Sequence, residues 1–474
     1  MLYNKVLLIN PCNNLTGTND LAALHPPLGL AYLAAVLRSN NIRVKIIDAS
    51  VLALSNKQVM KIVFAEKPEL VGISINIATA RSGIELSKYI KKTTSMNVCL
   101  GGPFASSNIE YVLRDAGADI TVVGEGENTL LEVCREKRLS KIRGIAWRSV
   151  DNNIIVNEPA DLIQNLDDLP IPAYDLLPPL KLYRSRIRKK PMTSILTSRG
   201  CPYNCTHCNH NIFGSRFRAF SPERVIEEME YLISKFGIRQ FDIVDDTFTQ
   251  DLSRAEKILD LIIKKKLNIV INLNNGIRAD TITYPIVKKM KRAGVFRVSI
   301  GCESGNNKIL RKIKKNLDLE KVKQVVNWFR KERIISNCFF MLGFPCDTKR
   351  TIWDTINFAI EANPSNATFS VLIPFPGTEV YSFLKNNDLL DKDIINGVDS
   401  GYYGERMYHK CLNLTSNEIA NLHSLAYKRF YLRFNKIVEL LLNIRSFNEL
   451  KYHFNLLKGA GDIIKRYINN VLTG

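Results

Sequence analysis

Short apolar runs alternate with helix-like stretches over residues 1–150. One of the helix-like stretches, residues 28–40, follows the pair Pro26-Pro27, and proline is common where a helix begins. Continuous apolar strands separated by helices are typical of a parallel sheet covered on both faces. Such sheets bind ligands at the carboxyl ends of their strands. The strands expected here are residues 5–10, 44–48, 70–75, 98–102 and 120–124.

The alternation resumes at Met192, after a hairpin-like pair of runs and a connector punctuated by prolines. Six strand–helix repeats predict a partial, TIM-type (β/α)6 barrel that is partly open, with its chemistry at the C-terminal ends of the strands. The expected strands are residues 193–198, 240–245, 268–274, 296–301, 336–342 and 368–374. The expected helices are residues 222–236, 253–266, 319–333 and 348–362.

The chain therefore divides into four expected parts. These are an α/β domain (1–150), a linker (151–191), the barrel (192–390) and a helical C-terminal region (391–474). In the last part Ser416 is expected to cap a helix with one apolar face. The residues of that face are Ile419, Leu422, Ala426, Phe430, Phe434, Ile437 and Leu441.

Composition limits the compartment and the partners. The start of the sequence does not resemble a signal peptide, and no apolar run is as long as a membrane span. Ten cysteines without paired spacings argue against a disulfide framework. We therefore expect a cytoplasmic protein. A net charge of +20 indicates either solvated helix faces or an anionic partner.

Three of the cysteines, Cys201, Cys205 and Cys208, stand close together just after the first barrel strand. Three soft thiolates in one loop bind a metal or a cluster. Zinc would need a fourth ligand, which His210 could supply, but the chain has no second CxxC pair. A four-iron cluster can use three cysteines and leave one iron open to a small molecule. Three unliganded thiols are the remaining alternative.

The spacing C-x3-C-x2-C after the first strand of a barrel resembles the radical S-adenosylmethionine (SAM) enzymes. The N-terminal block resembles the Rossmann-like domain of their cobalamin-binding branch, which includes methylases and the anaerobic magnesium-protoporphyrin ester cyclase. The resemblance covers residues 1–435 and departs at His207 and Phe104. The segments that carry it include "SRGCPYNCTHC", "FDIVDDTFTQD", "NGIRAD", "VSIGCESGN", "MLGFP", "IPFPGTEVY", "HPPLGLAYLAAVLR", "GGPFAS" and "VGEGENTL".

The resemblance implies roles for residues at the ends of the barrel strands. The three cysteines would hold a 4Fe-4S cluster that cleaves SAM to a 5′-deoxyadenosyl radical, so the cofactors carry the difficult step. Asp245 or Asp246 would bind the SAM ammonium, unless one of them caps the next helix. Arg278 would meet the SAM carboxylate, or else be a surface ion-pair residue. Glu303 would bind the ribose hydroxyls, or else be a buried structural carboxylate. The turn at 373–378 would shape the adenine site or close the barrel.

For cobalamin, the resemblance predicts binding without a histidine ligand to cobalt, because the D-x-H-x-x-G signature is absent. His25 is then a turn residue, although a cobalt ligand is the other possibility. Ser74 would contact the cobalamin tail, or be an ordinary strand hydroxyl. Four glycines would line the corrin and its tail, or merely form tight turns: Gly101, Gly102, Gly124 and Gly126.

Three functional hypotheses remain. The first is a cobalamin-dependent radical SAM methyltransferase acting on an unactivated carbon, with a flavodoxin or ferredoxin as reductant. The second is a radical cyclase or oxidoreductase in which cobalamin donates no methyl group, and the third is a non-catalytic scaffold. The substrate could be a small molecule, a lipid or a peptide, and no nucleic-acid module is visible. A basic C-terminal helix (Lys428, Arg429, Arg433, Lys436) could touch a membrane or pack on the barrel.

Overall fold

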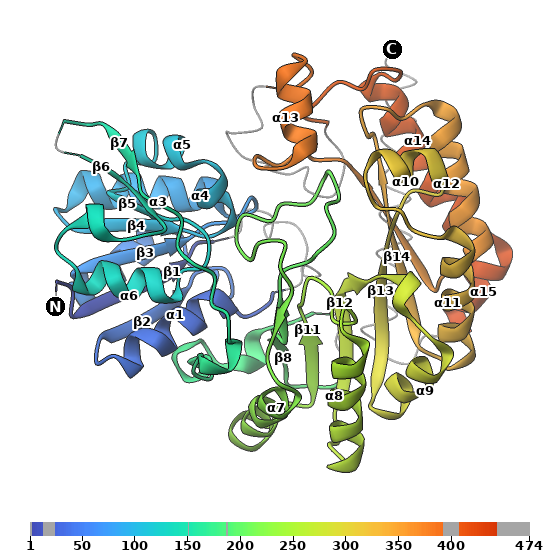
Figure 1. The fold of residues 1–474 in the computed structure, drawn as a ribbon, viewed down its shortest axis with the longest axis horizontal. Helices are drawn as coiled ribbons and strands as arrows, with labels where there is room; N and C mark the ends of the chain where they lie inside the picture. Colours follow the sequence, from blue (N-terminus) through green and yellow to red (C-terminus); the bar gives the residue numbers. More distant parts are fainter. Residues whose placement is uncertain (1, 13–23, 150, 186–187, 392–406, 443–474) are drawn as a thin grey trace.

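The computed structural model describes residues 2–12, 24–149, 151–185, 188–391 and 407–442. Two sheets dominate this part of the chain and lie next to each other (Figure 1). One sheet belongs to the N-terminal block and the other forms the barrel. The expected α/β architecture with a partial parallel barrel is confirmed.

The N-terminal sheet has the order β2-β1-β3-β4-β5-β6-β7. Strands β1 to β5 are parallel, and the hairpin β6–β7 adds an antiparallel edge that extends past residue 150. The strands are β1 (Lys5–Asn10), β2 (Arg43–Asp48), β3 (Leu70–Ser74), β4 (Asn97–Gly101), β5 (Ile120–Val122), β6 (Ile145–Arg148) and β7 (Ile154–Val156). All five expected strands and the hairpin are therefore present.

Helices cover both faces of this sheet, as its continuous apolar strands require. On β1, Leu8 packs with the helices of one face, whereas its neighbour Leu7 packs with those of the other. The first face carries α1 (Leu28–Ser39) and α6 (Glu127–Arg135). The second carries α2 (Asn56–Glu66), α3 (Ala80–Thr93), α4 (Pro103–Ser107) and α5 (Ile109–Arg114).

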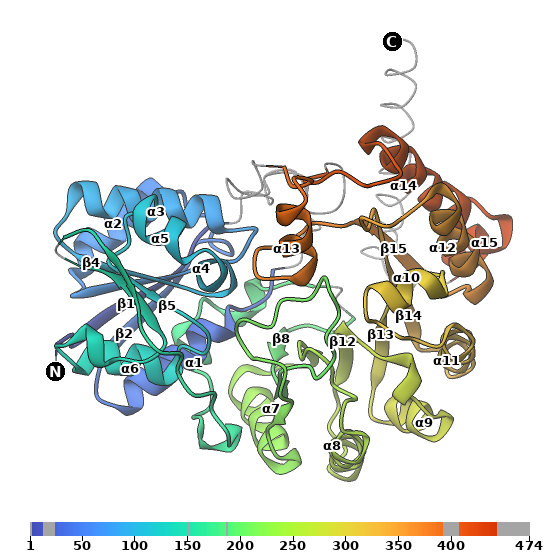
Figure 2. The same cartoon turned by 45° about the horizontal axis from the view of Figure 1, so that its top comes forward.

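The barrel sheet is wholly parallel, in the order β15-β14-β13-β12-β11-β8. Its first and last strands are not paired, so the barrel does not close (Figure 2). The strands are β8 (Met192–Ile195), β11 (Gln240–Ile243), β12 (Val270–Ile277), β13 (Val295–Glu303), β14 (Ile335–Leu342) and β15 (Asn366–Val371). Each expected strand is found within a few residues of its predicted bounds.

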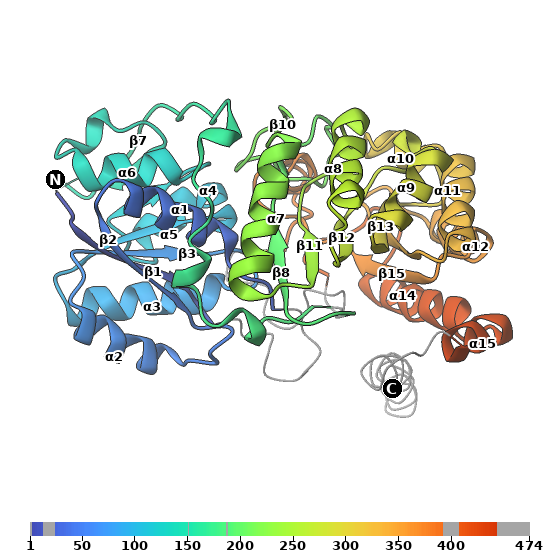
Figure 3. The ribbon, with the colours of Figure 1, turned by 90° about the horizontal axis from the view of Figure 1, so that it is seen from below.

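The helices that follow β8 to β14 lie outside the strands (Figure 3), whereas the helix after β15 lies between the two blocks at the top of Figure 1. In chain order, the helices are α7 (Pro222–Phe236), α8 (Leu252–Lys264), α9 (Tyr284–Arg292), α10 (Asn307–Lys312), α11 (Leu319–Lys331), α12 (Lys349–Ala362) and α13 (Glu379–Asn386). The cap of α8 is Asp251, which accepts a hydrogen bond from the Arg254 amide. The alternative that Asp245 or Asp246 caps this helix is therefore wrong.

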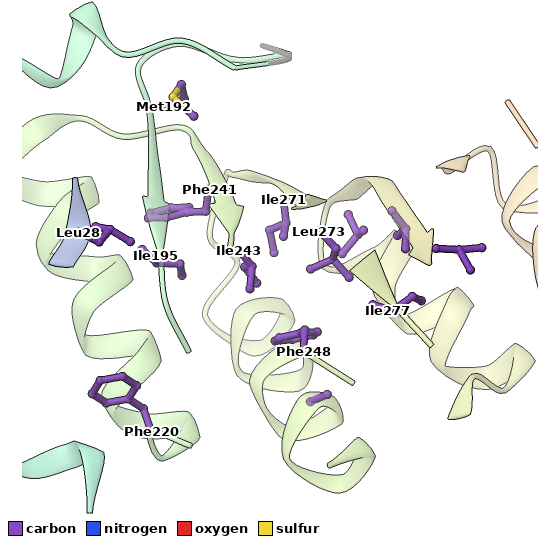
Figure 4. Packing of buried hydrophobic residues seen from close by; sticks show 14 of the residues in the cluster. Leu28, Met192, Ile195, Phe220, Phe241, Ile243, Phe248, Ile271, Leu273 and Ile277 are labelled. Carbon is purple, nitrogen blue, oxygen red and sulfur yellow. The ribbon is translucent and has the colours of Figure 1, made fainter. Parts of the chain in front are cut away.

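One hydrophobic core joins the two blocks. Leu28 of α1 belongs to the same buried cluster as Ile195 of β8, Phe241 of β11 and Ile271 of β12 (Figure 4). On the barrel strands, the residues that alternate with those of this cluster point away from it, toward the inside of the barrel. There Ser299 of β13, Asn337 of β14 and Asn366 of β15 lie in register as a polar row inside the barrel.

The C-terminal helix differs from the prediction. Thr415, not Ser416, is the cap, because the Thr415 and Glu418 side chains each bond the other residue's backbone amide. The expected single helix is two helices, α14 (Ser416–Tyr431) and α15 (Phe434–Leu442). The expected apolar face is therefore broken, and Phe434 is 79% exposed. None of the described helices is both long and apolar enough to span a membrane.

Candidate active site

A single loop between β8 and α7 carries the three cysteines. It begins and ends in two short strands, β9 (Ser198–Arg199) and β10 (Arg218–Ala219), which pair antiparallel as a neck. Gly200 follows β9 with a φ of +81°, and a Cβ there would lie 2.2 Å from the Arg216 carbonyl oxygen. Only glycine fits this position. The neck places Cys201 near the carboxyl end of β8.

We expect Gly200→Ala to lower the free energy of unfolding by about 2–4 kcal/mol, because it combines an unfavourable φ with a backbone clash. Gly29→Ala is the matched control. Gly29 lies within α1, and nothing lies within 4 Å of its added Cβ, so alanine there should stabilise by up to about 1 kcal/mol. Denaturant unfolding measures both changes, and equal stability of the two variants would contradict this neck geometry.

The three thiols have different surroundings. Cys205 is buried, Cys201 is half-buried and Cys208 is exposed. A hydrogen bond from the Cys208 thiol and the positive charge of Lys315 lower the pKa of Cys205 to about 7. Burial raises the pKa of Cys201. A thiol of lowered pKa ionises readily, and the thiolate is the form that binds metal.

Among the residues that the structure describes, no three His, Cys, Asp or Glu side chains converge on a single-ion site. The zinc alternative with His210 therefore gains no support. A 4Fe-4S cluster does not need such convergence, since each thiolate binds a different iron. Three thiols on one loop, with the ammonium of Lys315 nearby to offset negative charge, fit such a cluster.

The two aspartates at the end of β11 hold the base of the cysteine loop. Asp245 is buried and accepts hydrogen bonds of 2.5–2.7 Å from Thr197 and Ser198. Asp246 accepts a hydrogen bond of 3.0 Å from the Gly200 amide, next to Cys201. Burial raises the pKa of both carboxyls. The Asp245 carboxylate is taken up by Thr197 and Ser198 at the start of the neck, whereas Asp246 lies beside the loop where SAM is expected.

Arg278 lies against the same loop and is not a surface residue. Its guanidinium pairs with Asp280 at 2.6 Å, donates to the Lys315 carbonyl oxygen at 3.0 Å and lies 3.8 Å from the centre of the Tyr203 ring. Its Nη1 atom is buried and has no partner among the described residues. This remaining donor could hold a carboxylate such as that of SAM.

Glu303 at the end of β13 faces Lys315, a residue that the sequence analysis did not identify. The carboxylate and the ammonium are 3.2 Å apart, and each side chain is 12% exposed. Burial alone would raise the pKa of Glu303, but the charges of Lys315 and His207 and the hydrogen bond from Lys315 together outweigh it and hold the pKa below its usual value. The φ of Glu303 is +62°, a strained conformation that is common at functional sites.

The turn after β15 also holds the cysteine loop. The Asn209 side chain donates to the Pro376 carbonyl oxygen at 2.8 Å, and the Val380 amide donates to the Thr206 carbonyl oxygen at 2.9 Å. Gly377 has a φ of +88° and lies against the side chain of Asn209. The turn expected at 373–378 therefore packs directly on the residues between and after the cysteines.

The carboxyl edge of the N-terminal sheet meets the same loop. Ser107 of α4 accepts hydrogen bonds from the side chains of Asn209 and Asn211, at 2.9 and 3.1 Å. A Cβ on Gly124 would lie 3.7 Å from the Asn211 carbonyl oxygen. The edge where cobalamin is expected thus faces the loop where the cluster is expected.

The residues predicted to line cobalamin have different reasons for their identity. Gly102 has a φ of +93°, and a Cβ there would lie 3.0 Å from the Ser74 hydroxyl. Gly101 is the last residue of β4 and is half-buried. At Gly126 a Cβ would lie 3.1 Å from a methyl group of Leu33, so helix packing accounts for this glycine. The Ser74 hydroxyl thus lies close to the backbone of Gly102. This fits an edge at which a ligand would contact backbone atoms.

His25 stands just before α1 and contacts the barrel. Its Nδ1 atom is 2.9 Å from the Ser194 hydroxyl of β8, and burial lowers its pKa. A contact with the barrel therefore accounts for this histidine, and its role toward cobalt stays a prediction.

Comparison with known proteins gives the class. Residues 195–359 match the Radical SAM superfamily, and residues 16–134 match the B12 binding domain. An uncharacterized methyltransferase of Pyrococcus horikoshii is 31% identical over all of this chain and 99% of its own length. The anaerobic magnesium-protoporphyrin IX monomethyl ester cyclase of Rubrivivax gelatinosus is 24% identical over 80% of this chain and 70% of its own. The cobalamin-dependent SAM radical enzyme OxsB shares the fold, with a TM-score of 0.77 and 17% identity over 96% of this chain and 71% of its own.

The chain thus belongs to the radical SAM superfamily, in the branch that also carries a B12-binding domain. It is an enzyme of the methyltransferase-like type, and its cofactors are a 4Fe-4S cluster, SAM and cobalamin.

Proposed function

We propose that this enzyme methylates an unactivated carbon of a polar small molecule. The observation that carries the proposal is the position of the cysteine loop. Asn209 of this loop donates both to Ser107 beside the cobalamin edge and to the Pro376 carbonyl oxygen at the barrel mouth. The cysteine loop therefore touches both expected cofactor regions, which supports transfer of a group between them.

When bound, the cofactors supply the radical and the methyl carrier, and the protein supplies position and charge. In the proposal Cys201, Cys205 and Cys208 hold the cluster. Arg278 and Glu303 orient SAM, the first through its unpartnered Nη1 atom and the second through its carboxylate. The thiols and these side chains come from different strand ends, as is usual in barrel enzymes.

The inside of the barrel supports a polar substrate. The side-chain oxygens of Asn272, Ser299 and Asn366 are buried and have no hydrogen-bond partner among the described residues. A hydrocarbon chain would leave these oxygens unsatisfied, at a cost of about 1–3 kcal/mol each. These oxygens are closed off in the structure, so only a substrate that displaces neighbouring side chains would reach them, and its hydroxyl, amine or amide groups would satisfy them better than a lipid chain.

The C-terminal basic residues support the same choice. Lys436 is buried and donates to the Pro364 carbonyl oxygen, and Arg433 donates to the Ile360 carbonyl oxygen at the end of α12. These two charges pack on the barrel helix. Fewer of the basic residues of this helix are therefore left to contact a membrane surface.

A cyclase or oxidoreductase is the second candidate, since the magnesium-protoporphyrin cyclase of R. gelatinosus is a relative. Anaerobic incubation of the reconstituted enzyme with a reductant, methyl-labelled SAM and pooled polar metabolites separates the two. Methylation predicts S-adenosylhomocysteine together with 5′-deoxyadenosine, and label in a product. 5′-Deoxyadenosine with an unlabelled product would instead favour the second candidate. Iron without bound cobalt after reconstitution would contradict both.

A further inference from the structure

The neck of the cysteine loop is held by the N-terminal block as well as by the barrel. Arg199 of β9 and Arg218 of β10 are opposite each other in the ladder. Both side chains are almost fully buried, with 1% and 3% of their surface exposed. They extend toward the segment Gly124–Glu127, which links β5 to α6.

Two buried carboxylates receive these guanidinium groups. Glu125 accepts from Arg199 through one oxygen and from Arg218 through the other, both at 2.9 Å. Glu127 accepts from Arg199 at 2.6 Å. The result is a cluster of two cations and two anions, hereafter the neck cluster, whose partners are 72 to 93 residues apart in the chain.

Further contacts surround the neck cluster. The Ile163 amide donates to Glu125, and Arg218 donates in turn to the carbonyl oxygens of Ile163 and Phe213. The guanidinium of Arg199 lies 5.2 Å from the Tyr32 ring and 5.0 Å from the Phe213 ring. Helix α1, the connector and the cysteine loop therefore all meet here.

Stability alone does not explain such a cluster. Burying charges costs desolvation free energy, and apolar residues of similar volume are often as stable in their place. A buried ion cluster does, however, permit only one alignment of its partners, because a shift leaves charges unpaired. Here the aligned parts are the loop that carries the cysteines and the turn that carries Gly124, beside the expected cobalamin edge.

We propose that Glu125 and Glu127 are positioning residues that hold the cysteine loop in register with the cobalamin-binding edge, so that retention of the iron–sulfur cluster depends on the N-terminal domain. The proposal rests on the cysteine and glycine roles proposed above. Neither carboxylate is expected to touch a cofactor.

The test uses the full-length protein reconstituted anaerobically with iron, sulfide and hydroxocobalamin. Glu125→Gln keeps the shape of the side chain but leaves a buried guanidinium uncompensated. The double variant Glu125→Gln/Arg218→Gln removes one anion and one cation and restores neutrality. Iron release to a ferrous chelator and the electron paramagnetic resonance (EPR) spectrum of the reduced cluster are measured, with the thermal midpoint as the measure of folding.

We expect the single variant to release iron roughly 10- to 100-fold faster than wild type, as is typical when residues supporting metal ligands are lost. The double variant should regain its thermal midpoint but still release iron fast and give an altered EPR spectrum. Arg38→Gln is the control, because it removes an exposed ion pair with Asp175 that also joins α1 to the connector. It should leave all three measurements unchanged.

Wild-type iron release and a wild-type EPR spectrum in the refolded double variant would overturn the proposal, since the neck cluster would then be only structural. Failure of the wild type itself to retain iron would overturn the proposed function, and this inference with it. Methyl transfer is not needed for either readout.

Discussion

Cys205→Ala is expected to leave the protein folded but unable to retain its iron. Cys205 is buried, and its pKa of about 7 makes it a ready thiolate at neutral pH. Two thiolates cannot hold a cluster that needs three protein ligands with one iron left open to SAM. Iron should fall from about four atoms per chain to near zero, and reductive cleavage of SAM should fall to background.

Iron analysis after desalting, together with production of 5′-deoxyadenosine, checks this expectation. The matched control is Cys134→Ala, another buried free thiol, which lies in the core of the N-terminal domain. It should keep its iron and lose only modest stability. Cys205→Ala that retains a full complement of iron would remove this cysteine from the proposed ligand set.

Lys315→Met is expected to lower the reduction potential of the cluster and to slow SAM cleavage by at least about tenfold. The ammonium of Lys315 is 3.2 Å from Glu303 and influences both Cys205 and Cys208. Removing a nearby cation destabilises the more negative, reduced cluster, so the potential falls. A fall of about 60 mV corresponds to roughly 1.4 kcal/mol for one electron.

Redox titration followed by EPR measures this shift. Lys314→Met is the control, because the adjacent lysine is half-exposed and pairs with Glu379 at the surface. Its removal should leave the potential and the rate near wild type. Lys315→Arg should retain most of the potential, because it keeps the charge. Equal potentials in wild type and Lys315→Met would mean that this ammonium does not act on the cluster.

The strands of both sheets could be predicted because most of them are largely apolar runs between helices, as is typical of buried parallel strands. The place of the candidate site followed, since the cysteines, Asp246 and Glu303 all come directly after such runs. The cap at Thr415 was missed because Ser416 is an equally good capping residue. The reciprocal bond with Glu418 decides between them.

The partners of charged residues could not be predicted. Lys315 stands in a lysine-rich segment, and only the fold shows that its side chain is largely covered beside Glu303, whereas that of Lys314 is exposed. Glu125 and Arg199 are 74 residues apart and lie in different blocks. Both stand in segments whose glycines and cysteines point to the cofactors. Charged residues flanking such segments are therefore worth testing as pairs.

The shared hydrophobic core has a consequence for engineering this enzyme. Because α1 of the N-terminal block packs into the same cluster as β8 and β11, the border between the two blocks is not a neutral place to recombine genes. A chimera that takes its cobalamin-binding half from a relative would inherit a mismatched surface along this border. Such chimeras should fold only when α1, residues 124–127 and the barrel residues that contact them all come from the same parent protein.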